Sequence, residues 1–346
     1  MSSDTTSPVI TDALVIGAGP VGLFQIFELG LQEIHAHVVD VLPEAGGQCM
    51  ALYPDKPIYD IPGLPASTGR DLTQRLLQQT APFQPQFHFK QRISGMQAQP
   101  DGRWLATTDQ GMSFLTKTVF IAAGVGAFVP RSLPLPELQA LESTQVFYTL
   151  EEASSAHGQH LVVVGGDDLA IQAALAALTH SPASVTVVHR RSTLDASPEW
   201  LQAFDQAVAA QKIAFLTAQI SQTELTNQRL SGLKIELTDG SSRVLACDQL
   251  WVMLGLSPQL GPLANWGLDM SRKQLAVNTE NFSTSATGIF AVGDINTYPG
   301  KRKLIVSGFH EATLAAFGAA AYLRPGQKIP LEYTTASPRL HRLLGV

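Results

Sequence analysis

The sequence predicts an α/β protein of two Rossmann-like, three-layer domains, the second inserted into the first. A short apolar segment followed directly by a Gly-rich turn occurs twice, at 13–22 and at 161–170. In both places an amphipathic or Ala-rich segment and a further apolar strand follow, which is the order of a βαβ unit. Apolar residues make up 45% of the 346 residues and charged residues only 15%, enough to bury a core in each of two domains.

The domain boundaries follow from two segments that resemble each other. The apolar segments 120–124 and 251–255 each end in Gly and are followed by Pro within a few residues. Strand, Gly and Pro together mark a change of chain direction, so we interpret both segments as crossings between domains. We therefore expect 1–126 and 257–346 to form one domain, and 127–256 to form the other.

The first Gly-rich segment carries the full pattern of a dinucleotide-binding fold. A strand over 13–16 leads into a GxGxxG turn, a helix follows, and the next strand ends in Asp40. Gly17 permits the tight turn, Gly19 lets the backbone approach a pyrophosphate, and Gly22 lets helix and strand pack closely. The amino end of the helix would face the phosphates, and Asp40 would accept a hydrogen bond from a ribose hydroxyl.

The second Gly-rich segment has the same order of elements but a different turn and a different end. Asp167 replaces the middle Gly of the turn, and the next strand closes on two arginines where an acid is expected for a ribose diol. Arginine accommodates a 2′-phosphate, so this unit is predicted to bind NADP rather than NAD. The candidate residues are Gly165, Gly166, Asp167, His189, Arg190 and Arg191. The alternative is a nucleotide fold whose site has decayed.

The composition argues against several classes of function. Lys plus Arg number 23 against 29 Asp plus Glu, and the net charge of −6 argues against nucleic-acid binding. Cys49 and Cys247 form no CxxC pair, so we expect neither a disulfide framework nor a metal site. The Ser/Thr-rich start does not have the pattern of a secretory signal, and the apolar stretch 314–323 is shorter than the roughly 20 residues that span a bilayer. We expect a cytoplasmic protein that does not enter the membrane.

Several short strings resemble one family of flavoproteins that contain two dinucleotide-binding domains. The strings are Gly-Gly-Gln at 46–48, Ala-Leu-Tyr-Pro at 51–54, Ile-Tyr-Asp-Ile-Pro-Gly at 58–63, Tyr-Pro-Gly-Lys at 298–301, Ser-Gly-Phe-His-Glu-Ala at 307–312 and Tyr-Thr-Thr-Ala-Ser at 333–337. With the two Gly-rich units and the late Gly293-Asp294, they closely resemble the ferredoxin/flavodoxin–NADP⁺ reductases of the thioredoxin-reductase-like type. The resemblance covers about Asp12 to Val346.

The resemblance implies FAD on the first unit and NADPH as the co-substrate on the second. The residues implied for FAD are Gly17, Gly19, Pro20, Gly22, Asp40, Gly47, Gln48, Tyr53, Gly124, Asp294 and Thr335. It also implies that Tyr53 stacks on one face of the flavin ring and that Tyr333, in the C-terminal extension, covers the other; ordinary core packing is the alternative for each. No side chain is assigned as catalytic, because the flavin itself carries the chemistry. The family further implies a homodimer, with the tail after Pro330 ordered over a flavin.

The absence of a CxxC motif selects the chemistry within this branch. A thioredoxin reductase needs a dithiol to pass two electrons to its protein substrate, whereas Cys49 has no partner nearby in the sequence and is interpreted as a small buried apolar residue. The resemblance then implies an FAD-dependent reductase that takes a hydride from NADPH and gives single electrons to ferredoxin or flavodoxin. The alternative is an FAD-binding electron-transfer or redox-responsive protein with an impaired pyridine-nucleotide site.

Two departures from the family pattern favour the alternative of an impaired pyridine-nucleotide site. Asp167 stands where the family has Gly, and Asp195 stands where it has another Arg. Two carboxylates in one anion site would repel a pyrophosphate, so we predict weak NADPH binding.

A basic run indicates a surface for the electron-transfer partner. Lys301, Arg302 and Lys303 follow Gly293-Asp294 closely and are predicted to steer a small acidic electron carrier toward the flavin. The alternative is a solvated loop without a partner.

Overall fold

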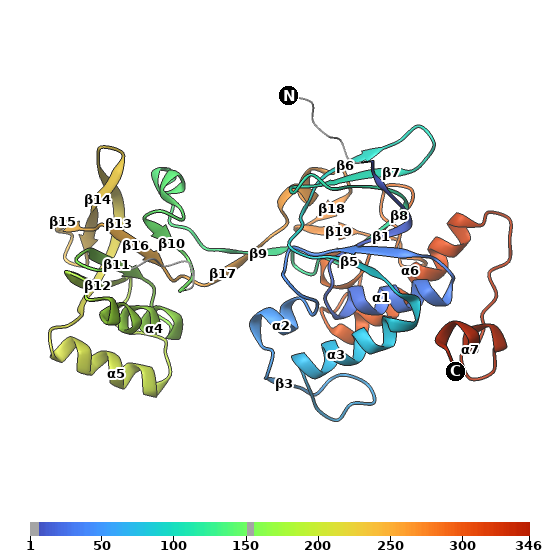
Figure 1. Cartoon of the computed structure of the whole chain (residues 1–346), viewed down its shortest axis with the longest axis horizontal. Helices are drawn as coiled ribbons and strands as arrows, with labels where there is room; N and C mark the ends of the chain where they lie inside the picture. Colours follow the sequence, from blue (N-terminus) through green and yellow to red (C-terminus); the bar gives the residue numbers. More distant parts are fainter. Residues whose placement is uncertain (1–6, 151–155) are drawn as a thin grey trace. The chain divides into compact units, whose positions relative to one another are not determined.

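The structure is a computed structural model that describes residues 7–150 and 156–346. The start of the Ser/Thr-rich segment, residues 1–6, lies outside the described residues. The chain divides into two compact units, Met1–Ala127 with Pro258–Val346, and Phe128–Ser257. Strands β9 (Ala127–Pro130) and β17 (Leu256–Gln259), where the chain passes between the units, pair as a two-stranded sheet (Figure 1).

The first unit is built on a sheet with the strand order β5-β2-β1-β8-β7-β6, in which β20 also pairs with β8. Strands β5, β2, β1, β8 and β20 are parallel, whereas β7 and β6 form an antiparallel extension. The strands are β1 (Val9–Ile16), β2 (Ala36–Val39), β5 (Gln86–His88), β6 (Ile93–Ala98), β7 (Trp104–Thr108), β8 (Ser113–Ile121) and β20 (Ile289–Ala291). The carboxyl ends of β1, β2, β8 and β20 therefore meet at one edge, where ligands of such folds bind.

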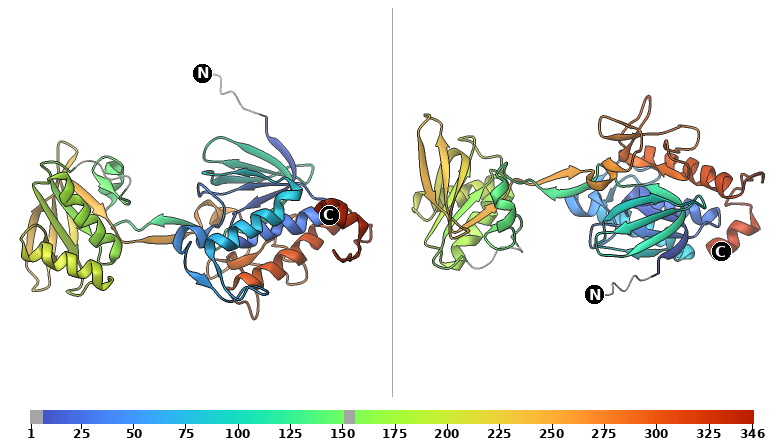
Figure 2. Two further views of the ribbon diagram at one scale, coloured as in Figure 1. Left: turned by 60° about the horizontal axis from the view of Figure 1, so that its bottom comes forward. Right: turned by 90° about the horizontal axis from the view of Figure 1, so that it is seen from above.

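Three helices cover one face of this sheet, α1 (Pro20–Leu31), α3 (Gly69–Thr80) and α6 (Ile305–Leu323) (Figure 2). Pro20 opens α1 at a position where its missing N–H is not needed, and Thr68 and Asp71 form a capping box at the start of α3. The buried surface of α6 is rich in Ala and Gly, which lets it lie close against α1: a Cβ on Gly308 would come within 2.3 Å of the Val21 side chain.

The opposite face of the sheet is covered in part by the antiparallel extension, where Ile93 and Ala106 share a core with Leu14 and Val39, and in part by a smaller sheet. Strands β18 (Met270–Ser271), β19 (Gln274–Ala276) and β21 (Asn296–Thr297) form it, and Leu275 packs into a core with Val119 and Ile289. The remaining elements are α2 (Gln48–Leu52), β3 (Pro57–Ile58), β4 (Ser67–Thr68) and α7 (Pro338–Leu344).

The second unit repeats the arrangement with the strand order β10-β16-β11-β12-β13-β14-β15. The strands are β10 (Val146–Phe147), β11 (His160–Val164), β12 (Ser184–His189), β13 (Ala214–Thr226), β14 (Arg229–Leu237), β15 (Ser242–Ala246) and β16 (Gln249–Val252). Helices α4 (Asp168–Ala177) and α5 (Pro198–Ala209) pack on one face. The predicted α/β class with two Rossmann-like domains is confirmed. None of the described helices is long and apolar enough to cross a membrane.

Candidate functional site

The Gly-rich turn between β1 and α1 is held by backbone contacts that leave no space for larger residues. A Cβ on Gly17, whose φ is +107°, would lie 2.4 Å from the Ala122 carbonyl oxygen. A Cβ on Gly22 would lie 2.0 Å from the Gly17 oxygen. By contrast, a Cβ on Gly19 would make only an ordinary van der Waals contact, 3.9 Å from the Gly47 Cα, and no side chain caps the amino end of α1. The first turn therefore presents free N–H groups and the positive end of the helix dipole to an anion.

Asp40 follows β2 directly and fastens this turn. One carboxylate oxygen accepts a hydrogen bond from the Ala18 N–H at 2.6 Å, and the other accepts one from the Leu42 N–H at 2.8 Å. Burial raises the pKa of Asp40, and the backbone N–H groups oppose that shift. Each carboxylate oxygen has a second lone pair, so a ribose hydroxyl can still donate to it.

Residues far apart in the sequence come together beside Gly19. Gly47 has a φ of +55°, and a Cβ there would lie 2.8 Å from the Gly19 Cα. A Cβ on Gly124, just beyond β8, would lie 2.8 Å from the amide nitrogen of Gln48. Four residues predicted for one cofactor therefore line the same sheet edge. Because these residues are small, the segments around Gly19, Gly47 and Gly124 pack closely, and the Gln48 amide provides a polar group beside them.

Cys49, Tyr53 and Asp294 form the adjacent part of the site. Cys49 is buried, and its thiol donates to the Tyr53 hydroxyl with an S···O distance of 3.6 Å. Burial raises the pKa of Tyr53, and the Cys49 contact and the Asp294 charge raise it further. Burial likewise raises the pKa of the Cys49 thiol, with Asp294 adding to it. Burial and the raised pKa both disfavour the thiolate form that a reactive cysteine needs.

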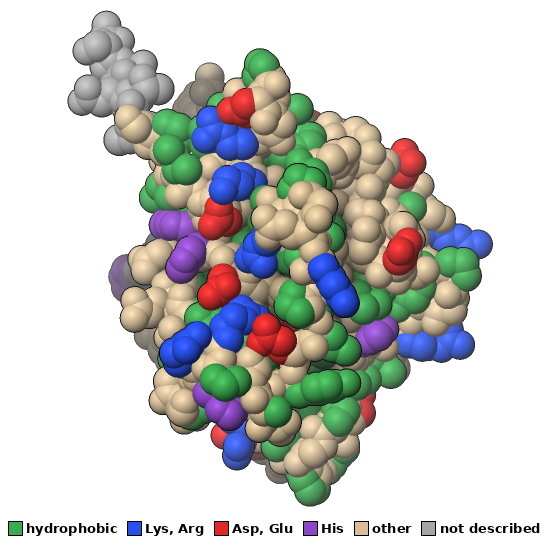
Figure 3. Space-filling model, turned by 90° about the vertical axis from the view of Figure 1, so that its right-hand side faces the viewer, with side chains coloured by type: hydrophobic (Ala, Val, Ile, Leu, Met, Phe, Trp, Pro, Cys, Tyr) green, Lys and Arg blue, Asp and Glu red, His purple; other side chains and the backbone are tan. Residues whose placement is uncertain are grey.

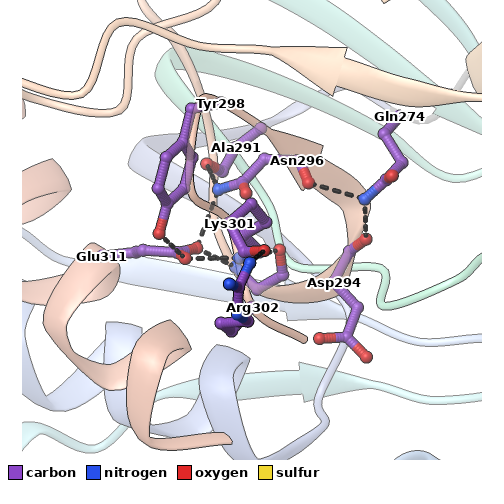
Figure 4. A network of polar contacts seen from close by, with 9 residues as sticks. Gln274, Ala291, Asp294, Asn296, Tyr298, Lys301, Arg302 and Glu311 are labelled. Atoms are coloured by element: carbon purple, nitrogen blue, oxygen red, sulfur yellow. Dashed lines mark hydrogen bonds and ion pairs between the residues drawn. The ribbon is translucent and has the colours of Figure 1, made fainter. Parts of the chain in front are cut away.

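Asp294 lies on a turn whose backbone is hydrogen-bonded to both members of a buried ion pair (Figure 4). Glu311 of α6 accepts from the Gly293 N–H at 2.7 Å and pairs with the Lys301 ammonium. The Asp294 carboxylate points away from this pair in Figure 4. Burial raises the pKa of Asp294, while Lys301 and Lys303 lower it.

Of the three basic residues predicted to steer an acidic carrier, Lys301 does not lie on the surface. Its side chain is only 6% exposed, because it is sequestered by Glu311, and its ammonium also donates to the Gly293 carbonyl at 2.9 Å. Arg302 and Lys303 are exposed, and only these two remain available to a partner.

The structure does not bring Tyr333 or Thr335 to Tyr53. Tyr333 is 69% exposed, and Arg339 of α7 donates to the Leu31 carbonyl at 3.3 Å. Leu31 ends α1, whereas the Gly-rich turn precedes its start, and a 12-residue helix is about 18 Å long. The face that carries α7 shows hydrophobic, acidic and basic side chains interspersed (Figure 3).

The Gly-rich turn between β11 and α4 in the second unit differs from the one between β1 and α1, because a carboxylate occupies the amino end of its helix. Asp167 is the N-cap of α4 and accepts from the Ala170 N–H at 3.2 Å. The His189 ring lies against Gly166, where a Cβ would come within 2.5 Å of it. Burial lowers the pKa of His189, as do Arg191 and Arg190, while Asp167 raises it.

Asp195 joins this turn through its backbone. Its N–H donates to the Gly166 carbonyl at 2.7 Å, and Asp167 and Asp195 form an isolated β-bridge. Arg190 and Arg191 are exposed and make no ion pair within the described part of the chain. Asp167 places a carboxylate at the helix end where an anion could bind, whereas the guanidinium groups of Arg190 and Arg191 could pair with a phosphate.

Known proteins of similar sequence or fold span almost the whole chain. The sequence profile described as pyridine nucleotide-disulphide oxidoreductase matches residues 11–316. A ferredoxin–NADP reductase from Polaromonas sp. (strain JS666) is 52% identical over 342 residues, covering 98% of this chain and 93% of that protein. A ferredoxin–NADP reductase 2 from Cupriavidus taiwanensis is 52% identical over 339 residues, covering 98% and 92%.

Solved structures share the fold. The thioredoxin reductase of Lactococcus lactis has a TM-score of 0.55 at 22% identity, covering 91% of this chain and 99% of that one. The bacillithiol disulfide reductase of Staphylococcus aureus has a TM-score of 0.58 at 18% identity, covering 90% and 99%.

Proposed function

The chain belongs to the pyridine nucleotide-disulphide oxidoreductase family, and we propose that within it the chain is an FAD-dependent reductase that passes electrons between NADPH and ferredoxin or flavodoxin. The observation that carries this proposal is the state of the two cysteines. Cys49 lies beside Tyr53 in the first unit, and Cys247 is fully buried in the second, where its thiol donates to the Gln249 carbonyl. Two buried thiols in separate units cannot act as the accessible dithiol that disulfide reduction needs.

The first unit offers a fitting site for FAD. Gly17 and Gly22 keep the turn tight, and Gly19, which has no side chain, would let the backbone approach a pyrophosphate. Asp40 would accept from the ribose, and Asp294 would bind the ribityl chain or the pyrophosphate. When bound, FAD would supply both hydride and single-electron chemistry.

Gln48 and Tyr53 complete the proposed site at the flavin end. The Gln48 amide lies beside Gly124, where it can hydrogen-bond to the ring system. Tyr53 is half-buried, and the bond from Cys49 restrains its hydroxyl. A stacked aromatic ring there would exclude water and fix the plane of the flavin.

We propose that NADPH binds the second unit weakly, through Arg190, Arg191 and the Gly165 turn. Asp167 also supports a second candidate function, an FAD-binding electron-transfer or redox-responsive protein without a working pyridine-nucleotide site. Its carboxylate caps α4 at the point where a pyrophosphate would have to bind.

We propose further that the protein is a homodimer. The tail anchors at the far end of α1 and turns Tyr333 outward, so a tail that covers a flavin would have to cover that of a second copy. Two unpaired cysteines suit a reducing compartment, which favours the cytoplasm.

A single set of anaerobic reactions tests these functions. NADPH should reduce ferredoxin or flavodoxin only in the presence of the FAD-loaded protein, and a thioredoxin disulfide should not be reduced. Rapid thioredoxin reduction would contradict the proposal. If NADPH leaves the flavin oxidised while the dithionite-reduced protein still reduces ferredoxin, the second candidate function is correct.

A further inference from the structure

The buried carboxylate of Glu311 collects four hydrogen-bond donors. One oxygen accepts from the Gly293 N–H at 2.7 Å and the Asn296 amide at 2.8 Å. The other accepts from the Tyr298 hydroxyl at 2.9 Å and from the Lys301 ammonium. Glu311 is completely buried, although it lies on a helix of small apolar residues. A buried ion pair is weak evidence for stability by itself, so a different role has to be considered.

The donor set requires a carboxylate and nothing else. All four partners donate, and an ionised carboxylate is a pure acceptor with enough lone pairs for four bonds. A Gln side chain at position 311 would turn its NH₂ group toward two of these donors, and a donor cannot accept their hydrogen bonds. Burial raises the pKa of Tyr298 to about 12, with the Glu311 hydrogen bond and charge adding to the shift, so the Tyr298 hydroxyl keeps its proton and donates at neutral pH.

The same contacts fix the backbone on both sides of Asp294. Glu311 and Lys301 hold the N–H and the carbonyl of Gly293, respectively. On the other side, the Gln274 amide donates to the carbonyls of Asp294 at 3.1 Å and Asn296 at 2.8 Å. These hydrogen bonds restrain the backbone of the turn on both sides of Asp294.

The Asp294 side chain, by contrast, is left without a partner. Among the described residues its carboxylate makes no hydrogen bond or ion pair, and it points away from the network (Figure 4). A half-buried, unpaired carboxylate on a rigid turn is arranged to accept hydrogen bonds from a bound molecule.

We infer that Glu311 is a positioning residue for the cofactor: through Lys301 and Gly293 it fixes the turn that directs the Asp294 carboxylate into the FAD site. This inference rests on the proposed function, since FAD is the molecule that Asp294 would contact. Glu311 itself does not touch the cofactor. Its contribution to FAD binding therefore passes through Asp294.

A double-mutant cycle on FAD affinity tests this directly. Glu311→Gln, Asp294→Asn and the double variant are prepared as apoproteins, and the FAD dissociation constant is measured by flavin fluorescence. We expect Glu311→Gln to weaken FAD binding about 30-fold in the wild-type background and less than about 3-fold in the Asp294→Asn background. The matched control is Asp40→Asn, in which Glu311→Gln should keep its full effect.

Two further measurements separate positioning from folding. Thermal unfolding of each apoprotein reports stability, and Tyr298→Phe removes a single donor while keeping the packing. If Glu311→Gln does not fold, Tyr298→Phe should weaken FAD binding about 3-fold in the wild-type background and not with Asp294→Asn. Equal effects of either substitution in both backgrounds would overturn the inference. A wild-type protein that binds no FAD would instead refute the proposed function.

Discussion

Replacing Asp167 should strengthen NADPH binding more than any other single change in the second unit. The structure places the carboxylate at the amino end of α4, bonded to the Ala170 N–H at 3.2 Å. A phosphate bound at that helix end would lie about 5 Å away, and the repulsion between unit charges at that distance is about 3 kcal/mol at an effective dielectric near 20. Because Asp167 is partly exposed, solvent lowers this value, and we expect an effect of about ten- to a hundredfold.

Two substitutions distinguish the charge from the side chain's bulk. Asp167→Asn keeps a capping side chain and removes the charge, whereas Asp167→Gly also removes the Cβ. Asn and Gly are both tolerated at a helix N-cap, so either substitution should lower the free energy of unfolding by only a few tenths of a kcal/mol, and the protein should still fold. The matched control is Glu199→Gln, which removes an acid from the first turn of α5 in the same unit. The smaller gain expected from Asp195→Arg need not add, since both residues act on one anion.

The assay is the NADPH concentration dependence of flavin bleaching after anaerobic rapid mixing. Both Asp167 variants should lower the KM for NADPH, Asp167→Gly at least as much as Asp167→Asn, while Glu199→Gln should leave it unchanged. If the wild-type protein already binds NADPH at micromolar concentration and neither variant changes the KM, the carboxylate does not oppose the phosphates.

Three other perturbations follow from the described residues. Burial between α1 and α6 raises the pKa of Glu28 to about 7. Between about pH 4.5 and pH 7 the folded state therefore keeps a proton on Glu28 that the unfolded state has released. The free energy of unfolding falls as the pH rises through this range. In urea unfolding, Glu28→Gln should therefore be about 2–3 kcal/mol more stable than wild type at pH 8 and equal at pH 4; an equal gain at both pH values would contradict this. Gly19→Ala should unfold at the same temperature as the wild-type protein, because the atom nearest to the added Cβ, the Gly47 Cα, is 3.9 Å away. The variant should nevertheless bind FAD at least about tenfold more weakly, because the Cβ would lie where the backbone approaches the pyrophosphate. Unchanged affinity would place the pyrophosphate elsewhere. Deleting 331–346 should alter the flavin spectrum and speed the reduction of non-specific dyes, and no change in either would exclude a flavin-covering tail.

The fold was predictable because its signals are local. The apolar strands, the Gly-rich turns and the acid after β2 lie within about 30 residues of one another, and each constrains the backbone directly. The contacts of Gly17 with Ala122 and of Gln48 with Gly124 show why these small residues are needed. Their roles toward FAD remain predictions.

The parts that escaped prediction depend on partners distant in the chain. Lys301 belongs to a basic run that is usually solvated, and only the fold shows that Glu311 neutralises it. A signal did exist, since an acid within the apolar segment of α6 is expected to be paired when buried. The position of Tyr333 likewise depends on Arg339 contacting Leu31, a long-range contact that no local pattern encodes.

Anaerobic mixing of the FAD-loaded protein with NADPH, followed at the visible flavin maximum, decides whether the protein passes electrons from NADPH to a carrier. We expect about one FAD per chain. NADPH should bleach the flavin at a lower concentration than NADH does, and oxidised ferredoxin or flavodoxin should restore the colour. A protein that takes up no FAD, or a flavin that NADPH bleaches but neither carrier reoxidises, would contradict the proposed function.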